Sequence, residues 1–283
     1  MPDTIRLDDV LHSATGALAV AGLESPRREA IRLWEGMHAA PAGSAILDRG
    51  AQMDEEVVGR FEAGVRRRAA GEPLAYVTGW TGFRRLALHI DSRALIPRPE
   101  TEGLVDLVLA RIQEGTVVDV GTGSGCIALA LASENPRLSV LAIDRSLDAL
   151  ALAAENRTLT GLPIAIMNAD LCLSLDDSSA RVLVSNPPYL TDAEYAALDD
   201  SVRKWEPRTA LASGADGLEA TTQLLRDGLR VVEPGGWLAL EVDCRRAEAV
   251  AQGALHYGWT EATVHDDLFG RARYVLARRS ETT

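Results

Sequence analysis

The chain has 283 residues, 47% of them hydrophobic and 25% charged, a composition typical of a globular protein with one domain of ordinary size and a second, small one. Its net charge of −12 disfavours generic binding to a nucleic-acid backbone, which draws on clustered Lys and Arg. No apolar run reaches the roughly 18–20 residues of a membrane span, and Met1–Arg6 lacks the basic and apolar regions of a signal peptide, so we expect a cytoplasmic protein without membrane contact.

Cysteine and histidine usage gives no sign of a metal site or of a disulfide framework. Cys126, Cys172 and Cys244 are odd in number and far apart, and the five histidines show no ligand spacing. We therefore expect no metal. The one concentrated basic run, Arg66–Arg68, indicates either a solvated helix face or a local docking patch.

Residues 1–72 are predicted to form a small helical domain. An apolar stripe from Leu7 to Leu23 marks the first helix. Ser25-Pro26 predicts the start of a second, with a Ser cap and Pro in the first helical position. A third is expected from Asp54 to Gly71, because acidic residues suit a helix N-terminus.

The residue pattern changes from helical to extended in residues 73–96, which we interpret as a β-hairpin connector. Tyr76–Trp80, Phe83 and the alternating run Leu86–Ile90 are short extended-type stretches punctuated by Gly and Arg. Pro97–Glu102 closes this connector, and a helix is expected from about Glu100 to Ile112.

From Thr116 onward, strands and helices alternate at the spacing of βαβ units, which predicts an α/β fold with a parallel, Rossmann-like sheet. Strands are expected at 116–119, 139–143, 163–167, 181–184 and 237–241, with a closing antiparallel pair at 260–264 and 272–277. Helices are expected at 125–133, 147–159, 218–232 and 247–257.

The first of these strands runs directly into a glycine-rich turn with the pattern D-x-G-x-G-x-G. Such a turn between a strand and a helix lets a ligand approach the backbone closely, and the next strand ends in Asp144, an acid suited to a ribose diol. The spacing resembles the first motif of the class I methyltransferases, which bind S-adenosylmethionine, and Asp170 falls where such enzymes often contact the adenine. A tight connection without a ligand, and plain strand-end acids, are the alternatives. The turn consists of Asp119, Val120, Gly121, Thr122, Gly123, Ser124 and Gly125.

A second motif, Asn186-Pro187-Pro188-Tyr189, follows the apolar run 181–184. Because the prolines donate no ladder hydrogen bonds and fix their own φ angles, this is a stiff corner at the carboxyl end of a strand. The Asn186 side-chain oxygen and the Pro187 carbonyl would each accept one N–H of a planar NH2 group, and Tyr189 would pack on its flat face. An amide or the exocyclic amine of adenine fits equally well, and a plain proline-capped strand end is the remaining alternative.

With both motifs placed, the whole chain resembles the HemK/PrmC family of protein glutamine methyltransferases. The signatures that carry the resemblance are Glu72–Tyr76, Ile96–Glu102, Glu206–Leu211 with Gly214–Leu218, and Asp267–Arg273. The resemblance implies a seven-stranded class I methyltransferase domain at 97–283, a β-hairpin linker at 73–96, and an N-terminal helical substrate-recognition domain at 1–72. It implies methyl transfer from S-adenosylmethionine, leaving S-adenosylhomocysteine, to the glutamine of the Gly-Gly-Gln motif in class-I peptide release factors.

By the same resemblance, Gly121 to Gly125, Asp144 and Asp170 would hold the cofactor, with Leu171 near the adenine. Asn186 would contact cofactor and glutamine alike, and Pro187, Pro188 and Tyr189 would complete the substrate site. Catalysis would rest on Asn186, Pro187 and Tyr189. We expect a monomer that binds the release factor and no nucleic acid.

Two stretches depart from the family pattern, Val242–Arg246 and Arg27–Glu29. Neither is expected to touch the chemistry, but both are compatible with altered partner recognition. Another protein, a small-molecule amide or amine, and adenine in nucleic acid therefore stay open as substrates. Residues 190–213 have no predicted structure and are interpreted as a lid that orders on the substrate, with Trp205 as its anchor or as a core residue.

Overall fold

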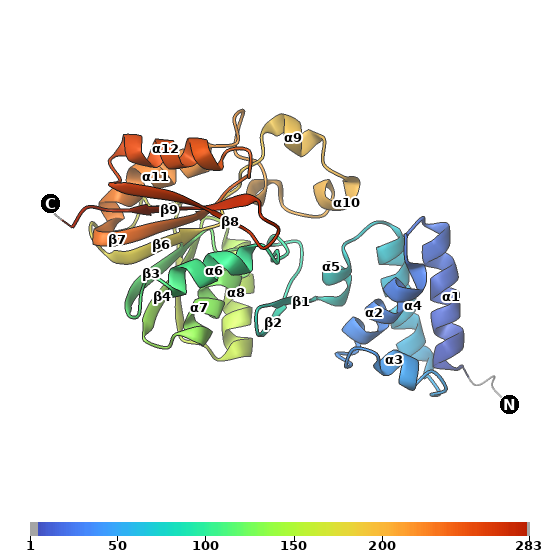
Figure 1. Ribbon diagram of the computed structural model, residues 1–283. Coiled ribbons are helices and arrows are strands. Elements are labelled where there is room, and N and C mark those ends of the chain that lie inside the picture. The colour runs from blue at the N-terminus through green and yellow to red at the C-terminus, as the bar shows by residue number, and fades with distance from the viewer. Residues whose placement is uncertain (1–4, 282–283) are drawn as a thin grey trace. The chain divides into compact units, whose positions relative to one another are not determined.

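The computed structural model describes residues 5–281; Met1–Thr4, on which part of the signal-peptide expectation rests, lie outside that range. The chain divides into two compact units (Figure 1). One, the N-terminal unit, holds the chain up to Trp80 together with Asp199–Trp205. The other, the sheet unit, holds Thr81–Leu198 and the chain from Glu206 onward.

The N-terminal unit is helical, as its apolar stripes predict. Its core is made by the fully buried side chains of Leu11, Leu33 and Phe61, which come from three different helices. The Pro26 helix start is confirmed, but Ser25 makes no capping hydrogen bond through its side chain. The helices are α1 (Leu7–Val20), α2 (Pro26–Met37), α3 (Ser44–Leu47), α4 (Glu55–Ala69), α5 (Leu74–Thr78) and α10 (Asp200–Arg203).

The extended structure predicted for Tyr76–Thr78 is wrong, because these residues form most of helix α5. Pro73 precedes the helix, and Gly79 ends it in the left-handed region with a φ of 78°. Arg67 donates hydrogen bonds to the carbonyls of Tyr76 and Val77, at 3.1 and 3.3 Å, and so satisfies two carbonyls of the last turn. The hairpin itself is shorter than predicted, with strands β1 (Trp80–Phe83) and β2 (Leu86–His89).

The sheet unit contains a seven-stranded sheet in the order β5-β4-β3-β6-β7-β9-β8. Five neighbouring strands run parallel, and β9 runs antiparallel to both of its neighbours. The strands are β3 (Gly115–Val120), β4 (Leu138–Asp144), β5 (Ile164–Asn168), β6 (Ala180–Ser185), β7 (Val232–Glu241), β8 (Glu261–Asp266) and β9 (Ala272–Arg278). The predicted fold class is confirmed, although β7 begins five residues earlier than the apolar run beginning at Trp237 indicated.

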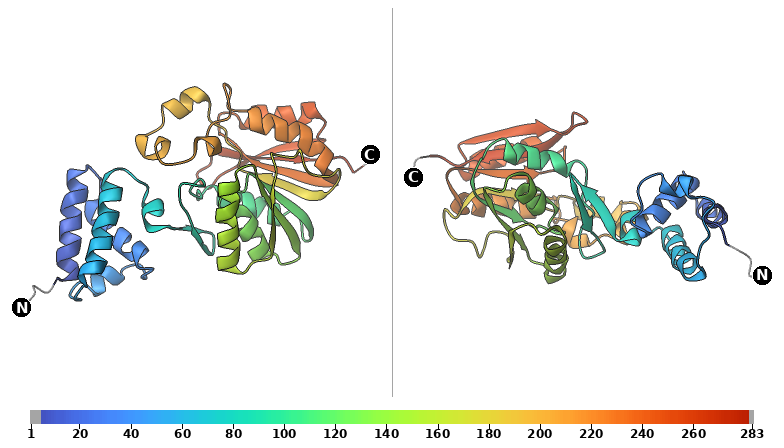
Figure 2. Two further views of the ribbon diagram at one scale, coloured as in Figure 1. Left: turned by 180° about the vertical axis from the view of Figure 1, so that it is seen from behind. Right: turned by 90° about the horizontal axis from the view of Figure 1, so that it is seen from below.

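Helices cover both faces of this sheet (Figures 1 and 2), which is why its parallel strands are apolar on both sides. One face packs against α6 (Thr101–Leu109), α7 (Cys126–Glu134) and α8 (Leu147–Thr160). The other packs against α11 (Glu219–Val231) and α12 (Ala247–Tyr257). Cys126 and Cys172 are buried in these two cores.

The segment 190–213 is not an irregular loop. It contains α9 (Asp192–Ala196), α10 and a 3-10 turn at Arg208–Ala210. Helix α9 begins with a capping box: Thr191 Oγ1 accepts from the Glu194 backbone N–H at 3.0 Å, and the Glu194 carboxylate accepts from the Thr191 N–H at 2.9 Å. The T-x-x-E pattern was present in the sequence and would have predicted this start.

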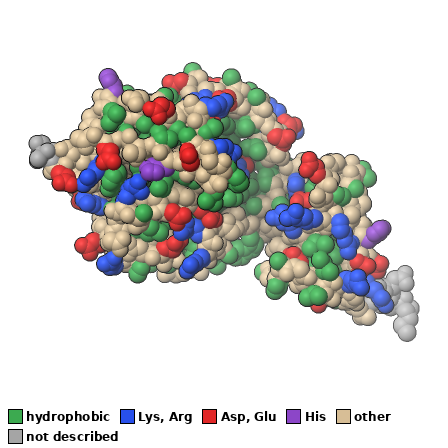
Figure 3. Space-filling view, in the orientation of Figure 1, with side chains coloured by type: hydrophobic (Ala, Val, Ile, Leu, Met, Phe, Trp, Pro, Cys, Tyr) green, Lys and Arg blue, Asp and Glu red, His purple; other side chains and the backbone are tan. Residues whose placement is uncertain are grey.

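Two surface properties bear on partners. Within residues 5–281, no helix is both long and apolar enough to cross a membrane. On the face of the sheet unit shown in Figure 3, acidic and basic side chains are interspersed, and neither sign gathers into a continuous patch.

Candidate active site

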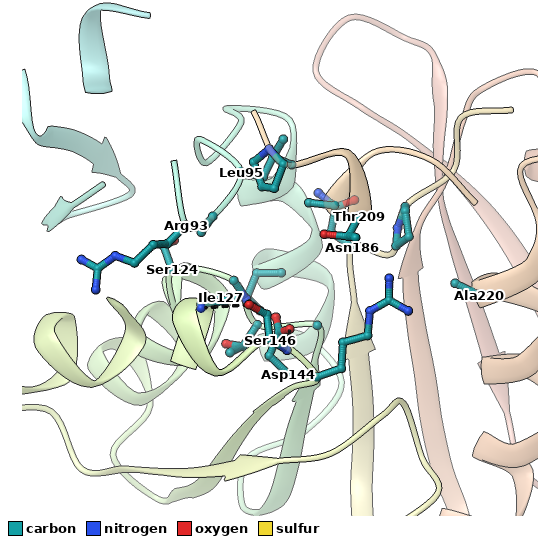
Figure 4. A pocket seen from close by; sticks show the side chains of 18 of the residues that line it. Arg93, Leu95, Ser124, Ile127, Asp144, Ser146, Asn186, Thr209 and Ala220 are labelled. Atoms are coloured by element: carbon teal, nitrogen blue, oxygen red, sulfur yellow. Dashed lines mark hydrogen bonds between the residues drawn. The ribbon is translucent and has the colours of Figure 1, made fainter. Parts of the chain in front are cut away.

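The carboxyl ends of the central parallel strands meet at one edge of the sheet. Asp119 in β3 lies beside Ala142 of β4 and Val184 of β6, so the segments that follow these three strands are neighbours. A cavity of about 500 Å³ opens at this edge (Figure 4). Ligands of open α/β sheets bind at this edge, between the segments that leave the strands.

The glycine turn forms one wall of the cavity. Gly121, Gly123 and Gly125 all have positive φ angles, of 72°, 55° and 84°, which side-chain-bearing residues adopt only with strain. A Cβ added at Gly121 would meet no heavy atom within 4 Å, so the backbone there borders open space.

A fully buried acid, Asp119, holds the glycine turn in place through hydrogen bonds. Its Oδ2 accepts from Thr122 Oγ1 at 2.6 Å and from the Ala128 N–H at 3.1 Å, which joins the turn to helix α7. Its Oδ1 has no hydrogen-bond partner among the described residues. Burial raises the pKa of Asp119 to about 7.

Asp144 lies at the end of β4 and borders the same cavity (Figure 4). Its carboxylate accepts from the backbone N–H groups of Gly123 and Ser146, at 3.0 and 2.9 Å, and so ties the turns after β3 and β4 together. Each carboxylate oxygen has further acceptor capacity for a ligand hydroxyl. Asp170 and Leu171, after β5, line the cavity next to it.

The Asn186 side chain faces the cavity from the end of β6 and is held by a chain of hydrogen bonds whose inner members, Thr101 and Glu241, are buried. Its Nδ2 donates to Thr101 Oγ1 at 3.1 Å, and Thr101 Oγ1 donates to Glu241 Oε2 at 2.7 Å. Thr101 and Glu241 are 2% and 1% exposed. A hydroxyl has one proton, and while Glu241 is ionised that proton goes to the carboxylate. The Thr101 oxygen therefore accepts from Asn186, which turns the amide oxygen of Asn186 away from Thr101.

The electrostatics of this chain depend on Glu241. Burial raises its pKa to about 7, although the Thr101 hydrogen bond and the nearby Arg273 favour the ionised form. Tyr189 is mostly buried, and its pKa is raised to about 12 by burial and by the charge of Glu241, so its phenol stays neutral. Burial likewise raises the pKa of the Cys126 thiol to about 12, which suits a core residue.

The departure at Val242–Arg246 was expected not to touch the chemistry, yet Arg246 contacts the Asn186–Tyr189 motif directly. Arg246 donates to the Tyr189 carbonyl at 3.4 Å and makes a bidentate pair with Glu194 of α9, both contacts at 2.8 Å. Arg246 therefore connects helix α9 to the Asn186–Tyr189 corner at the end of β6.

The sequence-predicted site residues divide into two groups. The structure brings together around the cavity Gly121, Thr122, Gly123, Ser124, Asp144, Asp170, Leu171, Asn186 and Pro188. Gly125, Pro187 and Tyr189 do not line it: Gly125 is the N-cap of α7, Pro187 is buried, and Tyr189 is half-buried. Within residues 5–281, no cluster of three or more His, Cys, Asp or Glu side chains is arranged to hold a metal ion.

Sequence reasoning assigned no individual role to several residues at the cavity. Arg98 lines it and pairs with the buried Glu206, at 2.7 and 2.9 Å, so two of the signature stretches are joined by an ion pair. Thr101 also lines it, and Glu241 lies behind Thr101. Arg98 and Thr101 belong to the Ile96–Glu102 signature, and that signature was the one sequence feature that pointed to them.

The cavity fits S-adenosylmethionine. Its volume lies in the usual range for small-molecule sites, roughly 300–1,000 Å³. The open space at Gly121 would admit the amino-acid part of the cofactor close to the backbone, and Asp144 offers a carboxylate to the ribose hydroxyls.

A mostly parallel sheet in this strand order, with a glycine turn after its first strand and Asn-Pro-Pro-Tyr after its fourth, defines a class I S-adenosylmethionine-dependent methyltransferase. Two family descriptions match the sequence, "PrmC N-terminal domain" over residues 9–79 and "Methyltransferase small domain" over residues 100–204. The chain belongs to the family of release factor glutamine methyltransferases.

The relatives that show this membership match over nearly their whole length. A release factor glutamine methyltransferase of Deinococcus radiodurans is 39% identical, with 98% of this chain and 99% of the relative covered. The protein of that name from Escherichia coli is 36% identical, with 90% and 93% covered. Among solved structures, a methyltransferase from Pyrococcus furiosus has a TM-score of 0.52 at 14% identity, covering 77% of this chain and 98% of that one. The catalytic domain of hMettl16, solved with an RNA hairpin, has a TM-score of 0.55 at 16% identity, covering 83% and 86%. These two likenesses concern the fold alone.

Proposed function

We propose that this protein transfers the methyl group of S-adenosylmethionine to the side-chain amide nitrogen of a glutamine in a class-I peptide release factor, the glutamine of its Gly-Gly-Gln motif. The names of its relatives support the substrate. The observation that carries the chemistry is the oriented amide of Asn186, held by Thr101 and Glu241 at the mouth of the cofactor cavity.

The substrate amide would be held by two acceptors. Its two N–H groups would donate to the Asn186 side-chain oxygen and to the Pro187 backbone carbonyl, which fixes the nitrogen and raises its electron density. Because an amide nitrogen is a poor nucleophile, most of the rate gain would come from orientation and from electrostatic positioning. Tyr189, neutral at physiological pH, would pack on the flat face of the substrate amide.

When bound, S-adenosylmethionine supplies an electrophilic methyl group on a sulfonium. Gly121 to Ser124 would lie along its amino-acid part, Asp144 would accept from its ribose hydroxyls, and Asp170 and Leu171 would border its adenine. Transfer would form the nitrogen–carbon bond and break the sulfur–carbon bond; the substrate amide would then be cationic and acidic, and its excess proton would leave to water without a strong base. S-adenosylhomocysteine is the other product.

We assign the binding of the release factor in part to the N-terminal helical domain, residues 1–72, joined through 73–96 to the methyltransferase domain, 97–283. The match of residues 9–79 to the PrmC N-terminal domain supports this division. A cytoplasmic location and a monomeric state remain our expectations, as does the lid role of the segment 190–213.

Labelled S-adenosylmethionine tests the substrate directly. Purified protein is incubated in parallel with a release factor, with its loop Gln→Ala variant, with duplex DNA and RNA, and with free glutamine. We expect label on the release factor alone. Label on nucleic acid, or equal label on the Gln→Ala variant, would contradict the proposal.

A further inference from the structure

The turn between β8 and β9, Asp267–Arg271, presents two large apolar side chains to solvent. Leu268 is 95% and Phe269 is 72% exposed. An aromatic side chain beside an aliphatic one on the surface is a frequent feature of protein-binding sites, since burial of these groups supplies much of the free energy of binding. This turn belongs to a stretch that the sequence singled out, and nothing in the proposed chemistry uses it.

A buried carboxylate holds the turn rigid. The side chain of Asp267 is fully buried and accepts from the backbone N–H groups of Phe269 and Arg271, at 2.8 and 3.1 Å. It also accepts from the side chains of Arg271 and Arg273, at 3.0 and 3.5 Å. The guanidinium of Arg271 stacks 5.1 Å from the centre of the Phe269 ring. A turn fixed in this way loses little conformational freedom when it binds.

The turn lies at the edge of the sheet that carries the Asn186 corner. Tyr274 of β9 pairs with Glu241 of β7, so the start of β9 is next to the end of β7. The Tyr274 hydroxyl donates to the carbonyl of Glu100, and Arg271 donates to the Glu100 carboxylate at 3.2 Å. Glu100 directly precedes Thr101, the partner of Asn186. Leu268 and Phe269 do not line the cofactor cavity.

We propose that Leu268 and Phe269 form a docking element for the protein substrate, contacting apolar side chains of the release factor beside its target glutamine; this rests on the proposed function. Their position outside the cavity excludes a role in holding the cofactor or a small substrate. The charges disfavour a nucleic acid, because Arg271 and Arg273 are already paired with Asp267, and Arg271 also with Glu100. What the turn leaves for a partner is apolar surface.

The test uses the full-length protein, an intact release factor and three variants. Leu268→Ala and Phe269→Ala are combined in one protein, and Leu255→Ala on α12, 43% exposed, is the matched control for truncating a surface leucine. Steady-state methylation gives KM and kcat for the factor, titration gives the Kd of the cofactor, and thermal melting checks the fold. The third, Asn186→Ala, serves as the inactive reference.

For the double variant we expect KM for the release factor to rise about tenfold or more, the change that truncating a pair of interface anchors produces. Its kcat, cofactor Kd and melting temperature stay near wild type, and Leu255→Ala changes none of these. An unchanged KM overturns the docking role. A fall in kcat with constant KM also overturns it, because the turn would then shape the reaction site. Failure of the wild-type protein to methylate the factor refutes the proposed function itself, which separates the two outcomes.

Discussion

Replacing Thr101 by Val tests whether the Glu241–Thr101–Asn186 chain orients the catalytic amide. Valine keeps the shape of threonine and removes the hydroxyl that accepts from Asn186 Nδ2 at 3.1 Å and donates to Glu241 at 2.7 Å. If Asn186 keeps its productive orientation in the variant, its half-buried NH2 group loses this partner. If it flips, the NH2 group faces the cavity, where the substrate needs an acceptor.

The expected size of the effect follows from the cost of an unpaired donor. Leaving one buried polar group without a partner costs about 1–3 kcal/mol. In the wild-type protein the Thr101 hydroxyl therefore favours the productive orientation of Asn186 over the flipped one by about this amount. Losing about 1–2 kcal/mol of it lowers kcat by about 5- to 30-fold. The free energy of unfolding should also fall by about 1–3 kcal/mol, because Glu241 loses its donor too.

Single-turnover methylation of a release factor at saturating cofactor measures this effect. Calorimetric titration of S-adenosylmethionine runs in parallel, because Thr101 also borders the cavity. Thr101→Ser is the control that keeps the hydroxyl, and we expect it to retain most of the rate. The reasoning fails if Thr101→Val keeps kcat within twofold of wild type, or if Thr101→Ser loses as much as Thr101→Val.

Three further predictions address other parts of the site. Because only ionised Glu241 compels the Thr101 proton to point toward it, kcat should fall as the pH drops below about 7, and Glu241→Gln should give a low rate that depends little on pH. Gly121→Ala introduces a Cβ at a φ of 72° that projects into the space where the cofactor would lie. If the free turn relaxes away from this φ and must return to it on binding, a strain of about 1–2 kcal/mol raises the Kd of S-adenosylmethionine, measured by titration, about tenfold. Arg246→Ala removes the bidentate contact to Glu194, so hydrogen exchange in α9 should accelerate. Arg245→Ala, whose side chain is 61% exposed, should accelerate it less.

The fold was largely predictable because its strands are short apolar runs buried on both faces, separated by helices at regular spacing. The glycine turn and the Asn186–Tyr189 corner were predictable for a related reason: each is a contiguous pattern whose backbone geometry is dictated by Gly or Pro. The failure at Tyr76–Thr78 is equally physical. These aromatic and β-branched residues favour strands, but Pro73, Gly79 and the donor groups of Arg67 stabilise a short helix instead.

The residues behind Asn186 could not be predicted from any local pattern. Thr101 is 85 residues before Asn186 and 140 residues before Glu241, and only the parallel sheet brings the three together. A buried glutamate at the end of β7 has no distinguishing spacing in the sequence. Likewise, the contact of Arg246 with the Tyr189 carbonyl depends on how two strand ends meet, and the sequence alone indicated no contact.

The choice of a glutamate at position 241 is best explained by the direction of the hydrogen bonds. Burial makes an ionised carboxylate costly there: its pKa is raised from 4.5 to about 7, so the stabilising contribution of this group is complete below pH about 4.5 and is lost as the pH rises through about 7. A glutamine would avoid this cost, but it can present either its oxygen or its NH2 group to Thr101. With the NH2 group facing Thr101, the Thr101 proton points at Asn186 and favours the flipped amide. Only an obligate acceptor fixes the Thr101 proton, and with it the Asn186 oxygen, in the orientation that methyl transfer requires. Ionised Glu241 thus lowers the stability of the fold near neutral pH, but it fixes the Thr101 proton, which determines whether the oxygen or the nitrogen of Asn186 faces the substrate.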